Sequence, residues 1–104
     1  MDKISPEVKA IIDEYLQKLR ENDIHIKEAL LFGSQLKGRA DKWSDIDIAL
    51  VSDDFEGNRY EDRNKIRKIT LSVNPMLSPL PFRTNDFSEK DPFVKHILKT
   101  GMRV

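Results

Sequence analysis

The stretch LFGSQLKGRADKWSDIDIAL, residues Leu31–Leu50, places a glycine-serine pair and an Asp-x-Asp sequence between two apolar runs. The first run, residues 29–32, ends at Gly33, and the second, residues 46–51, is rich in branched side chains. Short apolar runs bounded by turn residues are typical of buried strands. The stretch therefore predicts two strands joined by a polar connection that begins with a short helical turn through Leu36.

The flanking sequence predicts three helices and a third strand. Ser5 and Pro6 are typical of a helix start and precede an apolar stripe with a 3.6-residue period. Residues 74–82 carry three prolines, which suit an edge strand better than a central one. The predicted elements are helices over residues 6–21, over 59–72 and from Asp91-Pro92 to Gly101, and a weak strand over 76–82. This order predicts an α+β (α/β) fold, a small mixed sheet covered by helices.

Length and composition narrow the class of protein. The chain has 104 residues, which predicts one domain over 1–104. It has no cysteine, which excludes disulfides, zinc-thiolate sites and thiol nucleophiles. Its 18 basic and 18 acidic residues give a net charge of zero, which disfavours nucleic acid as a partner. No stretch has the roughly 18 apolar residues of a membrane span, and the N-terminus lacks the apolar segment of a signal peptide. We therefore expect a soluble cytoplasmic protein without a membrane partner.

Gly33 and Ser34 at the end of the first strand are candidates for binding phosphate. A glycine there permits a tight turn, and backbone amides that open a helix point toward an anion. The Ser34 hydroxyl can donate to a phosphate oxygen, Gly38 relieves crowding, and Lys37 and Arg39 add positive charge nearby. An ordinary helix cap is the alternative, because helix starts prefer the same residues.

Asp45 and Asp47 at the start of the second strand are candidates for binding a metal. Alternate residues of a strand share a face, so their carboxylates project the same way with Cα atoms roughly 6.5 Å apart. Ile46 and Ile48 then point into the core. Two like charges on one face repel unless a cation lies between them, and magnesium typically takes one or two carboxylates together with substrate phosphates. The alternative is a strand face exposed to solvent.

Together these residues resemble the nucleotidyltransferase fold of the DNA polymerase beta superfamily, most closely its minimal nucleotidyltransferase branch. The superfamily pattern is Gly-Ser, about ten residues and Asp-x-Asp; here it is Gly33-Ser34, QLKGRADKWS and Asp45-Ile46-Asp47. The segment GSQLKG also fits the Gly-Ser-x-x-x-Gly version of the motif. The resemblance covers residues 24 to about 87 and is fairly specific for the superfamily, although it does not identify a substrate.

The resemblance implies that AMP is transferred from ATP to a hydroxyl acceptor with Mg²⁺. Gly33 and Ser34 would hold the β and γ phosphates, with Lys37 and Arg39 beside them. Asp45 and Asp47 would be the catalytic residues that hold the metals of a two-metal, in-line displacement.

Active members of the superfamily usually supply a third carboxylate from a later strand. Family members often have an aspartate before a Pro-Phe pair in the third strand, where this chain has Ser78 in LSPLPF. Asp86 is the nearest downstream carboxylate, but its context predicts a helix cap, and Asp53 and Asp54 are predicted to be turn residues. The metal that activates the acceptor therefore lacks an evident third ligand.

The resemblance also implies a biological setting. Minimal nucleotidyltransferases are often antitoxins of the MntA type, paired with a helical, RNA-cleaving HEPN toxin to which they add AMP on a tyrosine. One alternative is a weakened nucleotide-binding or protein-binding antitoxin that neutralises its partner by contact, which Ser78 favours. Another is a transferase acting on a small molecule, although the chain is short for that, and a polymerase role is least favoured by the zero net charge. The apolar residues among 102–104 leave pairing with another chain, as a homo-oligomer, open.

Overall fold

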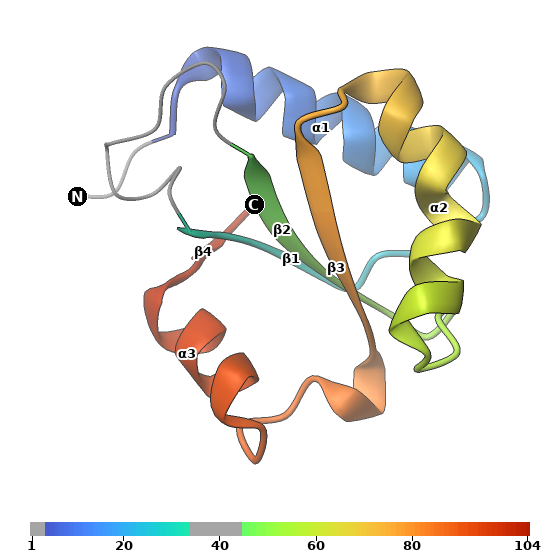
Figure 1. Cartoon of the computed structure of the whole chain (residues 1–104). Coiled ribbons are helices and arrows are strands. Elements are labelled where there is room, and N and C mark those ends of the chain that lie inside the picture. The colour runs from blue at the N-terminus through green and yellow to red at the C-terminus, as the bar shows by residue number, and fades with distance from the viewer. Residues whose placement is uncertain (1–3, 34–44) are drawn as a thin grey trace.

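The computed structural model describes residues 4–33 and 45–104, and within them it contains three α-helices and a four-stranded mixed sheet (Figure 1). The strand order is β3-β2-β1-β4, with β1 antiparallel to β2 and β4 and with β2 parallel to β3. The elements are α1 Pro6–Glu21, β1 Glu28–Phe32, β2 Ile46–Ser52, α2 Arg59–Val73, β3 Leu77–Arg83, the 3₁₀ helix η2 Thr84–Asp86, α3 Pro92–Thr100 and β4 Met102–Arg103. The predicted α+β fold with a mixed sheet is confirmed.

Helices α1 and α3 begin as their sequences predict. The Ser5 hydroxyl accepts a hydrogen bond from the backbone N–H of Val8 at 3.2 Å, and the Asp91 carboxylate accepts one from Phe93 at 2.9 Å. In both helices a proline follows the capping residue, where its missing N–H removes no hydrogen bond of the helix. Local chemistry therefore fixes these two helix starts.

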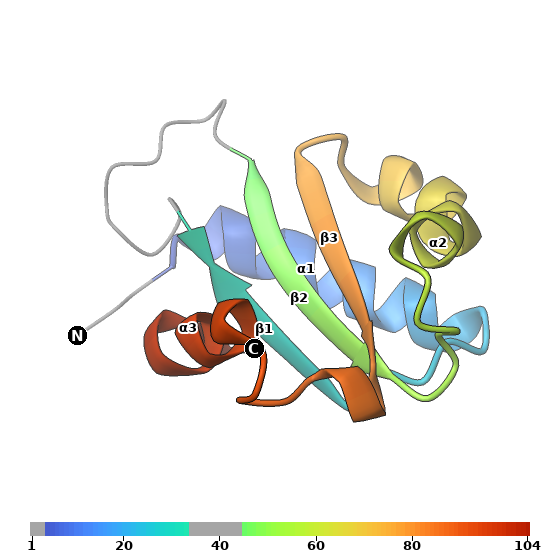
Figure 2. The same ribbon diagram turned by 60° about the horizontal axis from the view of Figure 1, so that its bottom comes forward.

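The helices lie on both faces of the sheet. Figure 2 shows α1 behind the sheet, α3 in front of it and α2 beside β3. The two-residue period of β2 divides its buried side chains between two cores, because Ile46 and Ile48 pack with α1 and α2, whereas Ala49 and Val51 pack with α3. Helix α2 is the crossover that returns the chain from β2 to the parallel strand β3.

Two polar side chains join α1 to α2 inside the core. Tyr15 is completely buried, and its hydroxyl oxygen lies 2.7 Å from that of Thr70, whose hydroxyl also donates to the carbonyl of Ile66 at 3.0 Å. Burial raises the pKa of Tyr15 to about 12. Tyr15 therefore acts as a neutral, hydrogen-bonded core residue rather than as a reactive group.

A buried carboxylate fixes the loop that leads into α2. Asp62 is 1% exposed and accepts hydrogen bonds from the backbone N–H groups of Glu56 at 2.8 Å and Gly57 at 3.0 Å. It lies in the first turn of α2, where the helix dipole favours negative charge. These bonds hold the start of α2 in place relative to the end of β2.

The sequence predicted the strand at one edge of the sheet but not the strand at the other. The proline-containing strand β3 lies at one edge, as predicted. At the other edge, Met102 and Arg103 pair with Leu31 and Leu30 of the same chain, where the sequence had left pairing with another chain open. None of the helices in the described ranges is long and apolar enough to cross a membrane.

Candidate functional site

Three strands bring one residue each into a row across the sheet, which we call the Asp47 row. Asp47 on β2 pairs with Phe32 on the antiparallel strand β1 and with Ser78 on the parallel strand β3. The strand period places Asp47 on the same face as Ala49 and Val51, the face covered by α3. The row lies at the end of the sheet where β1 ends and β2 and β3 begin.

Asp45 and Asp47 lie close enough to influence each other electrostatically. Asp45 is exposed and directly precedes β2, while Asp47 is half-buried within the strand. Burial, and then the negative charge of Asp45, raise the pKa of Asp47 above its usual value. A carboxylate that burial and a like charge both destabilise is a suitable ligand for a cation, which relieves both effects.

Gly33 packs directly against the Asp47 carboxylate. Its φ of +82° lies in the left-handed region, and a Cβ built on its backbone would lie 2.5 Å from Oδ2 of Asp47. Any other residue here would be strained and would push the carboxylate aside. The end of β1 and the start of β2, which the sequence assigned separately to phosphate and metal, therefore lie in contact.

Part of the predicted phosphate site lies outside the described residues. Ser34, Lys37 and Arg39, and the helical turn predicted through Leu36, all fall within residues 34–44. Their roles stay predictions from the sequence, and Gly33 is the member of the predicted phosphate site that the structure describes.

Ser78 occupies the position expected for a third carboxylate. The parallel register pairs it directly with Asp47, and it is half-buried on the same face of the sheet. Among residues 4–33 and 45–104 there is no group of three or more His, Cys, Asp or Glu side chains that could hold a metal ion. The described donor set therefore consists of two carboxylates with a hydroxyl beside them, which fits a magnesium ion that keeps several waters and substrate oxygens.

The other candidate carboxylates lie elsewhere and have partners. Asp53 and Asp54 are turn residues, as predicted, about 20 Å along β2 from Asp47 at roughly 3.3 Å per residue. The Asp54 carboxylate accepts a hydrogen bond from the backbone N–H of His25 at 2.7 Å, which lowers the pKa of Asp54. Asp86 lies in η2 and pairs with Arg83 at 3.4 Å. Asp86 therefore does not take the place of the missing acid beside Asp47.

Comparison with known proteins identifies the family. Residues 12–101 match the family model described as "Nucleotidyltransferase domain". The chain belongs to this nucleotidyltransferase family. It is also similar to a Methanocaldococcus jannaschii protein named "Putative protein adenylyltransferase", with 29% identity over 103 aligned positions that cover 90% of this chain and 68% of the relative. The family match runs from α1 through α3 and includes the Asp47 row.

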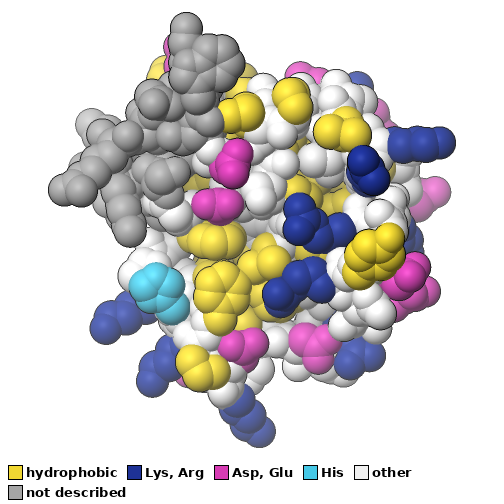
Figure 3. All heavy atoms as spheres, in the orientation of Figure 1, with side chains coloured by type: hydrophobic (Ala, Val, Ile, Leu, Met, Phe, Trp, Pro, Cys, Tyr) yellow, Lys and Arg dark blue, Asp and Glu magenta, His cyan; other side chains and the backbone are white. Residues whose placement is uncertain are grey.

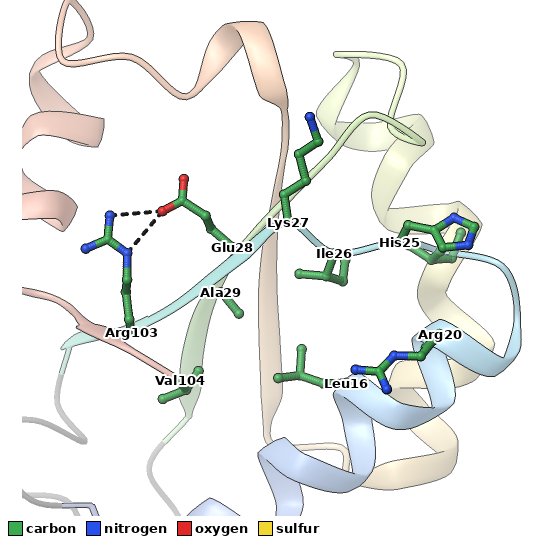
Figure 4. A pocket seen from close by; sticks show the side chains of 10 residues that line it. Leu16, Arg20, His25, Ile26, Lys27, Glu28, Ala29, Arg103 and Val104 are labelled. Carbon is green, nitrogen blue, oxygen red and sulfur yellow. Dashed lines mark hydrogen bonds and ion pairs between the residues drawn. The ribbon is translucent and has the colours of Figure 1, made fainter.

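A pocket away from the Asp47 row has different chemistry. A pocket of about 480 Å³ lies between α1, β1 and the C-terminal residues (Figure 4). Its acidic group, Glu28, is bound by the Arg103 guanidinium at 2.9 and 3.1 Å, and its Lys27 ammonium pairs with Asp53 at 2.9 Å. Asp47 does not line this pocket, so the carboxylates suited to a metal lie outside it.

Sequence reasoning did not single out Phe32, the member of the Asp47 row on β1. Its ring packs edge to face against Phe93 of α3, with centroids 6.0 Å apart and an interplanar angle of 84°. Phe32 thus provides an apolar border beside Asp47. The signal available in the sequence was its position directly before Gly33 at the end of a buried run.

Proposed function

We propose that this domain transfers AMP from ATP to a hydroxyl group on another molecule, with Mg²⁺ held by Asp45 and Asp47. The observation that carries the proposal is the contact between Gly33 and the Asp47 carboxylate, which joins the end of β1 to the start of β2. An ion held by Asp47 would lie within reach of phosphates bound at Gly33. This is the arrangement that a metal-nucleotide site requires.

The chain's own residues have defined tasks in this reaction. The Gly33 backbone and Ser34, with Lys37 and Arg39, would bind the β and γ phosphates and orient the α phosphorus. Asp45 and Asp47 would hold Mg²⁺, which when bound neutralises charge on the phosphate oxygens and lowers the pKa of the acceptor hydroxyl. The acceptor oxygen bonds to the α phosphorus, the bond from that phosphorus to the bridging oxygen breaks, pyrophosphate leaves with the electron pair, and the hydroxyl proton passes to water.

We propose one side of the sheet for each reactant, from the requirement for in-line displacement. In a displacement of this kind the attacking and leaving oxygens lie on opposite sides of phosphorus. With the phosphates at Gly33, pyrophosphate leaves on the β1 side of Asp47. The acceptor hydroxyl then approaches from the β3 side, over Ser78.

The partner that we propose is a HEPN-type toxin in the cytoplasm, with one of its tyrosines as the acceptor. The resemblance to minimal nucleotidyltransferases supports this setting, as does the name of the archaeal relative, which describes a transferase acting on protein. We further propose that residues 1–104 act as one domain in this role.

Ser78 supports an alternative function. Ser78 pairs with Asp47, at the position where the resemblance predicts a third carboxylate. A chain with a hydroxyl there can keep the fold and the nucleotide site and still lack efficient transfer. In this alternative the domain is an antitoxin that neutralises its partner by contact.

The test is transfer of label from ATP labelled on its α phosphate to a co-expressed HEPN protein. The proposed enzyme labels that protein with Mg²⁺ present and leaves it unlabelled when the metal is chelated. Tight binding of the partner without label would overturn the transferase and favour the contact antitoxin. Absence of both label and ATP binding would overturn the nucleotide site itself.

Replacing Ser78 with aspartate tests whether the missing acid limits the reaction. We expect Ser78→Asp to raise the transfer rate at limiting Mg²⁺ by about tenfold or more, because a third carboxylate beside Asp47 strengthens the acceptor-side metal. Calorimetric titration measures the affinity for Mg²⁺, which should rise, and the labelled-ATP assay measures the transfer rate. Ser78→Asn is the matched control, because asparagine has nearly the same size as aspartate but no charge. Unchanged Mg²⁺ affinity in Ser78→Asp would contradict the expectation.

A further inference from the structure

A groove of about 690 Å³ runs between α2 and the edge strand β3, and we call it the α2 groove. Three arginines that line it, Arg59, Arg63 and Arg67, are spaced four residues apart and therefore share one face of the helix. The other lining residues are Tyr60, Asn64, Thr70, Leu71, Pro75, Leu77 and Pro79. In Figure 3 basic side chains gather on this side of the molecule, next to hydrophobic ones.

The arginines of the α2 groove are available to an outside partner. In the part of the chain that the structure describes, no ion pair involves Arg59, Arg63 or Arg67. The Arg59 guanidinium lies over the Phe82 ring at 5.4 Å from its centroid, which orients it without neutralising its charge. Positive charge therefore extends for about 12 Å along the helix, at about 1.5 Å per residue. A complementary partner carries carboxylates or phosphates over that length.

Apolar side chains lie near both ends of the arginine stripe. Tyr60 is 73% exposed and Leu71 is 55% exposed, and both line the groove. Arginine and tyrosine are enriched at protein interfaces and in their energetic hot spots. The combination of free arginines with exposed apolar anchors favours a protein segment that offers both carboxylates and an apolar side chain. Net charge also disfavours nucleic acid, since the chain as a whole is neutral.

The backbone of β3 limits how such a segment binds. The N–H of Ile46 donates to the carbonyl of Met76 at 2.9 Å, so the backbone N–H and C=O groups of the even-numbered residues of β3 point toward β2. The backbone of the odd-numbered residues points toward the free edge, where Pro79 and Pro81 have no N–H to donate. Pairing of another strand along this edge is disfavoured, and a partner is recognised through the side chains of the groove.

We propose that the α2 groove docks an acidic segment of a partner protein, with its carboxylates on Arg63 and Arg67 and an apolar side chain against Tyr60 or Leu71. Resting on the proposed function, this partner is the protein that receives AMP. Leu77 and Pro79 of the groove lie on the α1 and α2 face of β3, whereas Ser78 and Asp47 lie on the other face. Because β3 is an edge strand, a partner docked in the groove reaches the Ser78 side by passing around this edge.

Fluorescence polarisation with a synthetic peptide tests the docking site directly. The probe is a fluorescein-labelled peptide of glutamates around a central leucine, measured at low salt because exposed ion pairs are screened. We expect the double substitution Arg63→Glu and Arg67→Glu to weaken binding by about tenfold or more. The control is Lys68→Glu, a single reversal of an exposed charge on the same helix outside the groove, and it is expected to bind like the wild type. Arg63→Glu alone, which changes the net charge by the same amount, should weaken binding. Circular dichroism verifies that each variant is folded.

Three further arms identify the occupant. The same peptide with glutamine in place of glutamate should bind weakly, and a single-stranded oligonucleotide of equal charge should bind less tightly than the acidic peptide. Sedimentation tests whether the groove binds a second copy of the chain. The wild type and the double variant should show the same association state. Equal peptide binding by wild type and double variant would overturn the proposal. So would tighter binding of the oligonucleotide, or self-association through the groove.

The docking site and the transferase fail in distinguishable ways. Asp47→Asn should leave peptide affinity unchanged, because Asp47 does not line the groove. The arginine double variant should raise the KM for the acceptor protein while the KM for ATP stays unchanged. If no transfer is found but the charge reversal abolishes peptide binding, the docking site stands and the transferase does not.

Discussion

Replacing Asp47 with asparagine is expected to abolish Mg²⁺-dependent transfer of AMP and to stabilise the metal-free domain. Loss of the metal ligand removes charge stabilisation worth about 4 kcal/mol in the transition state, which corresponds to about a thousandfold in rate. Stability rises because the neutral amide ends the repulsion by Asp45 and the cost of burying a charge. The labelled-ATP assay and the midpoint of urea unfolding measure the two effects.

The pH dependence of the same variant provides an independent readout. The pKa of Asp47 is raised in the folded chain, so the metal-free domain loses stability as the pH rises through that pKa. Asp47→Asn lacks this loss, and the two stability curves should converge at low pH. Because protons compete with the metal for the carboxylate, Mg²⁺ affinity of the wild type should fall as the pH falls through the same pKa.

Asp53→Asn is the control for the loss of a carboxylate. Asp53 belongs to the turn after β2, pairs with Lys27 at 2.9 Å and lies at the opposite end of the strand from the Asp47 row. Its substitution should leave transfer at the wild-type rate. Equal transfer by wild type and Asp47→Asn would refute the assignment of the metal site.

Replacing Gly33 with alanine is expected to damage both the fold and the site. An L-residue in the left-handed region costs about 1–2 kcal/mol, and the new methyl group would meet Oδ2 of Asp47 at 2.5 Å. The displaced carboxylate holds the metal poorly, so transfer should fall by about a hundredfold or more. Urea unfolding and the labelled-ATP assay again separate the two losses.

Gly57→Ala controls for backbone strain. Gly57 also has a positive φ, of +94°, but its nearest neighbours are side-chain atoms of Asp86 and Arg83 rather than of Asp47. It should lose stability while keeping transfer. A double-mutant cycle with Asp47→Ala isolates the steric contact, because the cost of Gly33→Ala should then fall to the strain alone. Additive stability losses would show that the two residues do not interact.

The sequence was most informative where local chemistry decides the structure. The Ser5 and Asp91 caps with their prolines predicted the starts of α1 and α3. The run of branched apolar residues predicted β2, and the two-residue strand period placed Ile46 and Ile48 in the core. The prolines predicted that β3 is an edge strand. Each of these signals lies within a few residues of the feature that it determines.

Features that depend on distant parts of the chain were not predicted. Strand β4 consists of two residues and exists because α3 returns the chain to β1, which no local pattern of Met102 and Arg103 indicates. The contact of Gly33 with Asp47 likewise depends on the register between β1 and β2. The four-residue spacing of the arginines is visible in the sequence and predicts that they share one face of α2. The groove itself could not be predicted, because it forms only where β3 lies beside the helix.

The crossover from β2 through α2 to β3 places the proposed metal site and the proposed docking site on successive elements of the chain. The carboxylates of the Asp47 row belong to the start of β2, whereas the arginines belong to the helix that follows it, and the buried Asp62 fixes the loop between them. Replacing the exposed residues of α2 with those of a relative should therefore change which partner protein is bound. The residues of β2 proposed to bind the metal would stay the same.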